Sequence, residues 1–383
     1  MNRYGFGIES FYFLFLVFFV VYLVIIKCTI PTNNRINRKK NVIFSFIPLF
    51  LLGALRGQTV GGDLKNYVPE FEALAHEYDL KSFIMEATHE PGYLLYTRLL
   101  GFLSDDPRIF IMGTLILSLI GPCYIIYKLS NRPQLSILIY YIMGFYTNTF
   151  NNVRQSLAIS LVLISFCMLK DGNFRKFCLG VLIATSFHYS ALLTMILYPF
   201  MQKEYTFKRL LFISSSGLAI VGGLGFILFQ YIALFILLKY DPEALLENSE
   251  GGGYGMFSLY FILFIFTAFV YFRYRKQCQN LRNFDALFFL NLIMIAMVIQ
   301  MSATFFHSMV RMTYYFFIPY MIIGFPYILS HSMGLIKACS RALLIFLLVF
   351  FFNNAYKRSN DSDISNSNSQ ATIPYVFLDT TIF

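Results

Sequence analysis

The stretch "IFIMGTLILSLIGPCYIIY" at residues 109–127 decides the fold class, because it carries no charged side chain over a length that suits one bilayer crossing. Hydrophobic residues make up 57% of the 383-residue chain and charged residues only 13%, which excludes a soluble globular protein. Similar apolar runs occupy residues 10–26, 42–55, 135–150, 155–169, 177–201, 209–238, 256–272, 286–306, 313–330 and 342–352.

The backbone of each run must satisfy its own hydrogen bonds inside lipid, which only helices and closed barrels achieve. The runs lack the alternating pattern of barrel strands. The sequence therefore predicts an all-α polytopic membrane protein, a bundle of about 10–12 transmembrane helices with one long external loop. We expect residues 1–352 to form a single integral-membrane helical domain and residues 353–383 to form a polar C-terminal tail.

The basic residues predict the orientation of the chain. "RINRKK" at 35–40 places four positive charges between the first two runs, so this loop should be cytoplasmic. The later loops that carry Lys and Arg are all cytoplasmic only if residues 177–201 cross the membrane twice. Such a segment would be a bent or re-entrant hairpin that turns near His188. The alternative keeps that segment as one span and splits residues 209–238 at Gly222-Gly223.

In the preferred orientation, the six cysteines fall on the cytoplasmic half, so none needs an oxidising environment. The net charge of +10 comes mainly from Lys and Arg at the ends of the apolar runs, so we expect no nucleic-acid partner.

The longest external loop extends from about residue 56 to 108, and its first part has helical spacing. From Asp63 onward, Tyr67, Phe71 and Leu74 recur at intervals of three or four residues. This spacing predicts a helix at the membrane surface that offers Asp63 and Tyr67 on one face.

Polar residues gather at the external ends of several runs. Arg154 and Arg311 each stand there alone against the positive-inside trend, which indicates an anionic ligand. Guanidinium binds phosphate bidentately, and a nearby carboxylate suits deprotonation of a hydroxyl. A lipid pyrophosphate in the outer leaflet meets these requirements. The stretches concerned are residues 56–67, "HEPGY" at 89–93, "NTFNNVRQS" at 148–156, "FHYS" at 187–190 and "FHSMVRMTYY" at 306–315.

Each candidate residue also has an ordinary structural explanation. Arg56 suits a snorkelling anchor at the end of a run, and Asp63 suits a helix cap. His188 suits a packed, hydrogen-bonded histidine, and the tyrosines suit interfacial anchors. The sequence leaves these alternatives open.

Four stretches, in this order, resemble the EpsG-like branch of the Wzy-type polysaccharide polymerases. They are "LRGQTVGGDLKNYVPEF", "EPGYLLYTRLL", "FNNVRQSLAISLVLISF" and "ATSFHYSALL", and the resemblance covers about residues 40 to 330. It implies an enzyme of the bacterial cytoplasmic (inner) membrane with an external or periplasmic active face. Such an enzyme joins oligosaccharide repeat units carried on undecaprenyl pyrophosphate into O-antigen, capsule or exopolysaccharide.

The resemblance also implies roles for individual residues. Arg154 and Arg311 would stabilise the pyrophosphate, and Asp63, Glu90 or His188 would orient or deprotonate the acceptor hydroxyl. The remaining substrate-binding candidates are Arg56, Tyr67, Tyr93 and Tyr189. The external stretches contain no Asp-x-Asp metal motif, so we expect metal-independent transfer without a cofactor.

The implied partners are the lipid-linked oligosaccharide, membrane lipid, a chain-length regulator and a flippase. Three other functions share a hydrophobic bundle with external arginines: a flippase or other transporter, an O-antigen ligase and a membrane acyltransferase. The run interiors hold no Asp, Glu, Lys or Arg, and the chain shows no internal repeat, which counts against a transporter.

Overall fold

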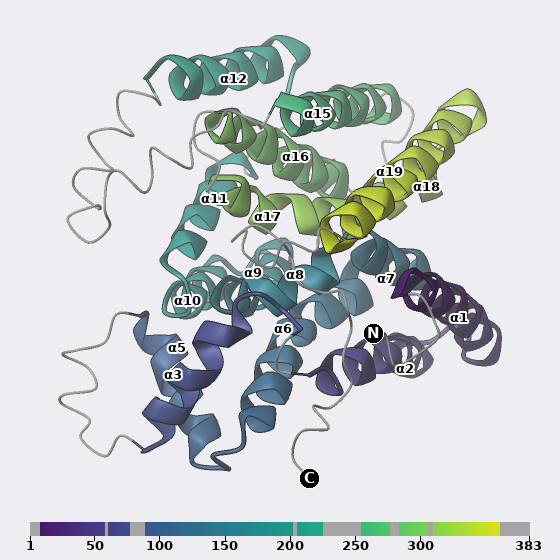
Figure 1. The fold of residues 1–383 in the computed structure, drawn as a ribbon. Coiled ribbons are helices and arrows are strands. Elements are labelled where there is room, and N and C mark those ends of the chain that lie inside the picture. The colour runs from purple at the N-terminus through teal and green to yellow at the C-terminus, as the bar shows by residue number, and fades with distance from the viewer. Residues whose placement is uncertain are drawn as a thin grey trace. The chain divides into compact units, whose positions relative to one another are not determined.

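The computed structural model describes residues 8–57, 60–76, 89–201, 205–224, 254–275, 283–304 and 309–360, and these ranges contain helices and no strand. Figure 1 shows these helices as a ribbon, and their contacts divide the chain into two compact units. One unit comprises Met1–Leu192 and Met321–Phe383, and the other comprises Leu193–Tyr320. The predicted all-α class is therefore confirmed.

Two long helices form the centre of the first unit. Helix α6 (Pro107–Leu129) packs along α9 (Val153–Lys170) and also against α2 (Arg35–Ala54). Gly121 allows the close approach of α6 and α9, because a Cβ atom there would overlap the backbone of Ser160. The backbone N–H of Gly121 donates to the Ser160 hydroxyl at 2.7 Å, which links the two helices across their contact.

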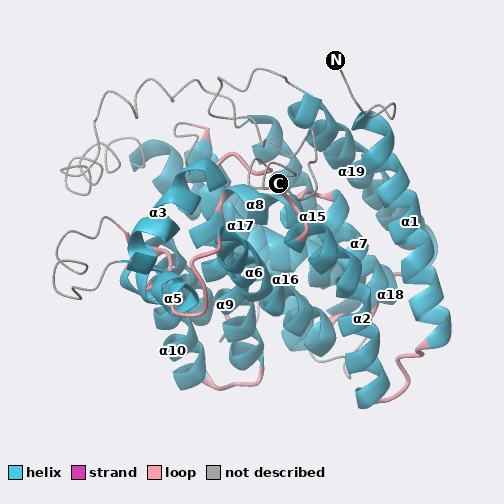
Figure 2. Cartoon of the chain, turned by 60° about the horizontal axis from the view of Figure 1, so that its bottom comes forward, coloured by secondary structure: helices cyan, strands magenta, loops and turns pink. Residues whose placement is uncertain are grey.

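Two shorter helices occupy the predicted external loop. They are α3 (Leu64–His76) and α5 (Pro91–Gly101), which pack against each other and against α6 (Figure 2). Phe71 and Tyr93 are fully buried in the apolar cluster between them. The helix predicted from the spacing of Tyr67, Phe71 and Leu74 is thus confirmed as α3, and Asp63 immediately precedes it.

The first unit also contains helices that end abruptly inside apolar sequence. Helix α8 (Phe145–Asn151) begins after Gly144, whose φ of 76° suits glycine. Helix α10 (Phe174–Thr185) packs on α9, and three residues separate it from the 3₁₀ helix η1 (Tyr189–Ile196). This interruption lies where the sequence predicts a turn near His188, and the number of crossings in that segment stays a prediction.

The remaining described helices of the first unit come from both of its segments. They are α1 (Ile8–Thr29), α7 (Pro133–Ile142), α18 (Phe325–His331) and α19 (Gly334–Asn360). The π-helical turn η5 (Tyr320–Gly324) joins the two units along the chain. Helix α19 continues past residue 352 to Asn360, so the first part of the predicted polar tail is helical. Residues 361–383 lie outside the described ranges.

Helix α16 (Asn283–Ala303) packs against both α15 (Tyr254–Arg275) and α17 (Val310–Pro319) in the second unit. The Tyr260 ring stacks on Phe317 at 4.3 Å between centroids, and its hydroxyl lies 3.2 Å from that of Thr313. The other described elements are α11 (Leu197–Phe200), α12 (Phe207–Ala219) and η2 (Ile220–Leu224). The alternative split at Gly222-Gly223 falls within η2, and the residues after it lie outside the described ranges.

Six helices in the described part of the chain are long and apolar enough to cross a bilayer. They begin at Pro107, Val153, Tyr254, Ala286, Val310 and Gly334, and shorter apolar helices accompany them. Many large apolar side chains on α1 and α19 are exposed, as expected for faces that contact lipid. The protein is a multi-pass membrane protein, and the total of about 10–12 spans stays a prediction.

Candidate functional site

The glycine-rich stretch before α3 is held against α8. Gly61 has a φ of 114° and lies against the carbonyl oxygen of Phe150, where a Cβ atom would overlap. The next residue, Gly62, donates its N–H to Oδ1 of Asn151 at 2.7 Å. These contacts hold the start of α3 beside the first residues of α9.

The "HEPGY" stretch places a buried carboxylate at the N-terminus of α5. Pro91 is the first residue of that helix, and Glu90 precedes it in extended conformation. The N–H of Gly92 donates to the carbonyl of Ser186 at 2.7 Å, and a Cβ atom on Gly92 would overlap Ser186. This close approach brings the segment after α10, including His188, to the Glu90 carboxylate.

Glu90 lies between an arginine and a histidine that are distant in the sequence. Its Oε2 accepts from Nη1 of Arg154 at 2.6 Å, and its Oε1 lies 2.9 Å from Nδ1 of His188. The backbone N–H of Tyr189 also donates to Oε1, at 3.4 Å. The Glu90 side chain is only 5% exposed, whereas the arginine and histidine each retain contact with solvent.

The surroundings of Glu90 determine its charge. Burial acts to raise the pKa of this carboxyl, but the hydrogen bond from His188 and the positive charge of Arg154 outweigh it and lower the pKa to about 2. Its place at the N-terminus of α5 also favours the anion. Glu90 is therefore ionised at neutral pH, so both its oxygens accept hydrogen bonds and Nδ1 of His188 must carry a proton.

Tyr67 and Tyr93 complete the surroundings of Arg154. Nε of Arg154 donates to the Tyr67 hydroxyl at 3.1 Å, and the guanidinium carbon lies 5.9 Å from the centroids of both tyrosine rings. Burial raises the pKa of Tyr67 despite the neighbouring arginine, so the phenol keeps its proton. Its oxygen accepts from Arg154, and its hydrogen remains available to a ligand.

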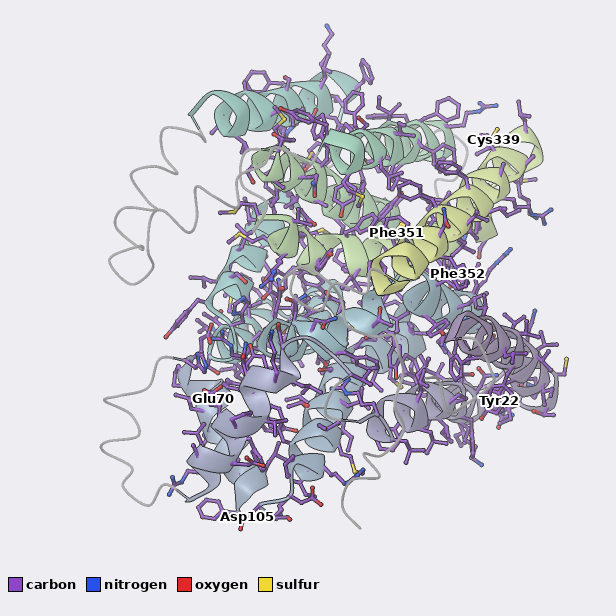
Figure 3. All side chains as sticks on the ribbon, viewed as in Figure 1. Tyr22, Glu70, Asp105, Cys339, Phe351 and Phe352 are labelled. Carbon is purple, nitrogen blue, oxygen red and sulfur yellow. The ribbon has the colours of Figure 1, made fainter. Side chains whose placement is uncertain are left out.

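A second carboxylate–histidine pair lies close by. Oε1 of Glu70, on α3, lies 2.9 Å from Nε2 of His89 (Figure 3 labels Glu70). The His89 ring contacts Tyr67 and Tyr93, with centroid separations of 6.5 and 5.8 Å. Neither Glu70 nor His89 is among the site residues predicted from the sequence, although both lie next to predicted ones. Glu70 lies one helical turn after Tyr67, and His89 precedes Glu90 in the chain.

The other predicted residues have different surroundings. Arg56 is 2% exposed, with its guanidinium 4.0 Å from the centroid of the Phe150 ring, so it is a buried residue of this segment. Asp63 accepts two backbone N–H groups through its carbonyl at the start of α3. Tyr189 is 64% exposed next to His188. Arg311 belongs to the second unit, at the exposed start of α17.

The cluster of Tyr67, Glu90, Tyr93, Arg154 and His188 is called the Glu90 cluster below. Because Nδ1 of His188 is bonded to Glu90, Nε2 is the ring nitrogen that can accept a proton from a ligand. A carboxylate that orients a histidine in this way is an arrangement suited to general base catalysis. Within the described ranges, no group of three or more His, Cys, Asp or Glu side chains is arranged to hold a metal ion.

Comparison with known proteins gives one match. The model of the EpsG family matches residues 39–377, a range that contains every residue of the Glu90 cluster. No curated protein and no solved structure matches the chain.

Proposed function

This chain belongs to the EpsG family, and from that premise we propose that it polymerises oligosaccharide repeat units carried on undecaprenyl pyrophosphate at the outer face of the bacterial cytoplasmic membrane. The family match confirms the resemblance seen in the four sequence stretches. It implies a polysaccharide polymerase, a glycosyltransferase type of enzyme, in the membrane. The lipid carrier, the external site and metal-independent transfer belong to the proposal.

The hydrogen bond between Glu90 and His188 carries the proposed mechanism. Joining two repeat units requires an acceptor hydroxyl to lose its proton while its oxygen attacks the anomeric carbon of the donor. Nε2 of His188 takes that proton, and the bond between the anomeric carbon and the pyrophosphate oxygen breaks. The pyrophosphate leaves with the bonding electron pair, and Glu90 stabilises the imidazolium that forms.

In this mechanism Arg154 is a positioning residue, because its hydrogen bonds are to side chains of the protein. It donates one hydrogen bond to Glu90 and one to Tyr67, so it positions the carboxylate and orients the phenol. Arg311 keeps its predicted role as a ligand of the pyrophosphate. A chain-length regulator and a flippase are the proposed partners.

The test is a glycan profile of a deletion strain complemented with variants. His188→Ala should leave single repeat units on the lipid carrier, while wild type restores long chains. His331→Ala is the matched control, because among the described residues the His331 side chain is hydrogen-bonded to the carbonyl of Tyr327 and contacts the Tyr327 ring, on its own helix. Long glycan in the His188→Ala strain would rule out the proposed base, and loss of all surface glycan in the deletion strain would indicate a flippase.

Sidedness is tested by cysteine labelling in intact cells. Tyr189 is exposed beside His188, so Tyr189→Cys should react with a membrane-impermeant maleimide added from outside. The wild-type protein, whose cysteines are predicted on the cytoplasmic half, is the control and should react only after permeabilisation. Protection of the Tyr189→Cys variant in intact cells would contradict an external site.

A further inference from the structure

The Glu70–His89 pair has no part in the proposed reaction, yet it lies against the same tyrosines as Arg154. Tyr67 and Tyr93 are 5.8 Å apart between centroids, and both contact the His89 ring as well as the Arg154 guanidinium. His89 is also bonded through the chain to Glu90. The pair is therefore part of the same site.

Both members of the pair are open to a ligand. The side chains of Glu70 and His89 are 24% and 23% exposed, so neither is sealed inside the protein. A partly exposed hydrogen-bonded pair contributes little to folding, so stability alone is a weak reason for this arrangement.

The charges around the pair disfavour an anionic ligand. The linked groups contain two carboxylates, Glu70 and Glu90, against the one guanidinium of Arg154. That guanidinium is already bonded to Glu90. A pyrophosphate placed at Glu70 would meet a negative charge, which is unfavourable at short range.

The available atoms indicate which ligand would bind. When Nε2 of His89 donates to Oε1 of Glu70, the second carboxylate oxygen and Nδ1 of His89 remain, and both are hydrogen-bond acceptors. Sugar hydroxyls can donate to such atoms, whereas a pyrophosphate has only acceptor oxygens when ionised. The Tyr67 hydroxyl adds one donor beside them.

We propose that Glu70, His89 and Tyr67 form a saccharide subsite, which binds the hydroxyls of a neutral sugar adjacent to the acceptor hydroxyl that His188 deprotonates. Glu70 and His89 accept hydrogen bonds from two sugar hydroxyls, and Tyr67 donates one. The assignment of this sugar to the acceptor repeat unit rests on the proposed polymerase function. The binding of a sugar at Glu70 does not depend on that function.

The test is a calorimetric titration of the purified full-length protein in lipid nanodiscs. The first probe is a set of oligosaccharides released from the strain's own surface polysaccharide by partial acid hydrolysis, and the second is inorganic pyrophosphate. Glu70→Gln should weaken oligosaccharide binding about tenfold, as expected for loss of a hydrogen bond to a charged group. Pyrophosphate binding should not weaken.

Two further variants keep the test decisive. His89→Gln can still donate to Glu70 but lacks the Nδ1 acceptor, so it should also weaken oligosaccharide binding without disturbing the fold. Glu72→Gln is the matched control, because Glu72 is exposed on the same helix and should bind like wild type. Size-exclusion profiles establish that each variant is folded.

Unchanged oligosaccharide affinity in both Glu70→Gln and His89→Gln would overturn the subsite, as would an absence of oligosaccharide binding by the wild type. Loss of pyrophosphate binding in Glu70→Gln, with oligosaccharide binding intact, would also overturn it. The glycan profile of the His188→Ala strain tests the proposed function separately, so the two ideas fail by different measurements.

Discussion

Replacing Glu90 by glutamine is the sharpest perturbation of the site, because it removes one charge and almost no volume. A glutamine has one acceptor oxygen and one donor NH₂ where the carboxylate has two acceptor oxygens. If the oxygen faces Arg154, the NH₂ faces Nδ1 of His188, which must then give up its proton and become an acceptor. The proton moves to Nε2, and the base is lost.

The opposite orientation is also unfavourable. With the amide oxygen on His188, the NH₂ faces the Nη1 donor of Arg154, 2.6 Å from the carboxylate oxygen in the native protein. Two donors then meet in a buried place. We therefore expect Glu90→Gln to reduce the polymerisation rate by about 10² to 10⁴-fold, the range for loss of a correctly oriented general base.

The stability of the protein should change as well, in a pH-dependent manner. The pKa of Glu90 falls from 4.5 to about 2, which corresponds to about 3 kcal/mol of interaction with the ionised form. Because the pKa of the folded state is the lower one, this stabilisation is fully present above pH 4.5 and is lost as the pH falls through about 2. The gap in melting temperature between wild type and Glu90→Gln should therefore narrow over that interval.

Activity is measured as the length distribution of product made from lipid-linked repeat units in proteoliposomes, and stability as thermal unfolding of the same preparations. Glu72→Gln, an exposed carboxylate on α3, is the control and should match wild type. A Glu90→Gln variant that keeps its rate within about twofold would refute the role of this carboxylate in orienting His188.

Three other substitutions test the geometry. Arg154→Lys keeps the charge but replaces the two donor nitrogens that face Tyr67 and Glu90 with a single ammonium nitrogen, so its products should be intermediate in length between those of wild type and Arg154→Ala. Gly92→Ala should push Ser186 away and lower the rate about 10²-fold with normal membrane insertion, measured in proteoliposomes. Gly121→Val should separate α6 from α9 and destabilise the fold by about 1–3 kcal/mol, seen as a lower melting temperature.

Each of these predictions has a contradicting result. If the products of Arg154→Lys were as short as those of Arg154→Ala, the positive charge by itself would not be enough to hold Glu90 in place. Gly92→Ala with wild-type rates would mean that its contact with Ser186 does not position His188. Gly121→Val with an unchanged melting temperature would mean that the two helices can move apart without cost.

Local patterns in the sequence determined the fold class, the helix α3 and the family of this protein. The long apolar runs predicted helices in a membrane because an unpaired backbone is too costly in lipid. The spacing of Tyr67, Phe71 and Leu74 predicted α3, and the four ordered stretches indicated the family. These features depend on neighbouring residues, so they can be recognised before the fold is known.

Contacts between distant residues were decided only by the tertiary structure. In the sequence Arg154 is an isolated external cation, and its position predicts a residue that binds phosphate. In the structure it bonds Glu90, which is 64 positions earlier, and Glu90 bonds His188, which is 98 positions later than itself. Hydrogen bonds and charge pairing act over a few ångströms in space, so chain separation gives no indication of which carboxylate, arginine and histidine meet.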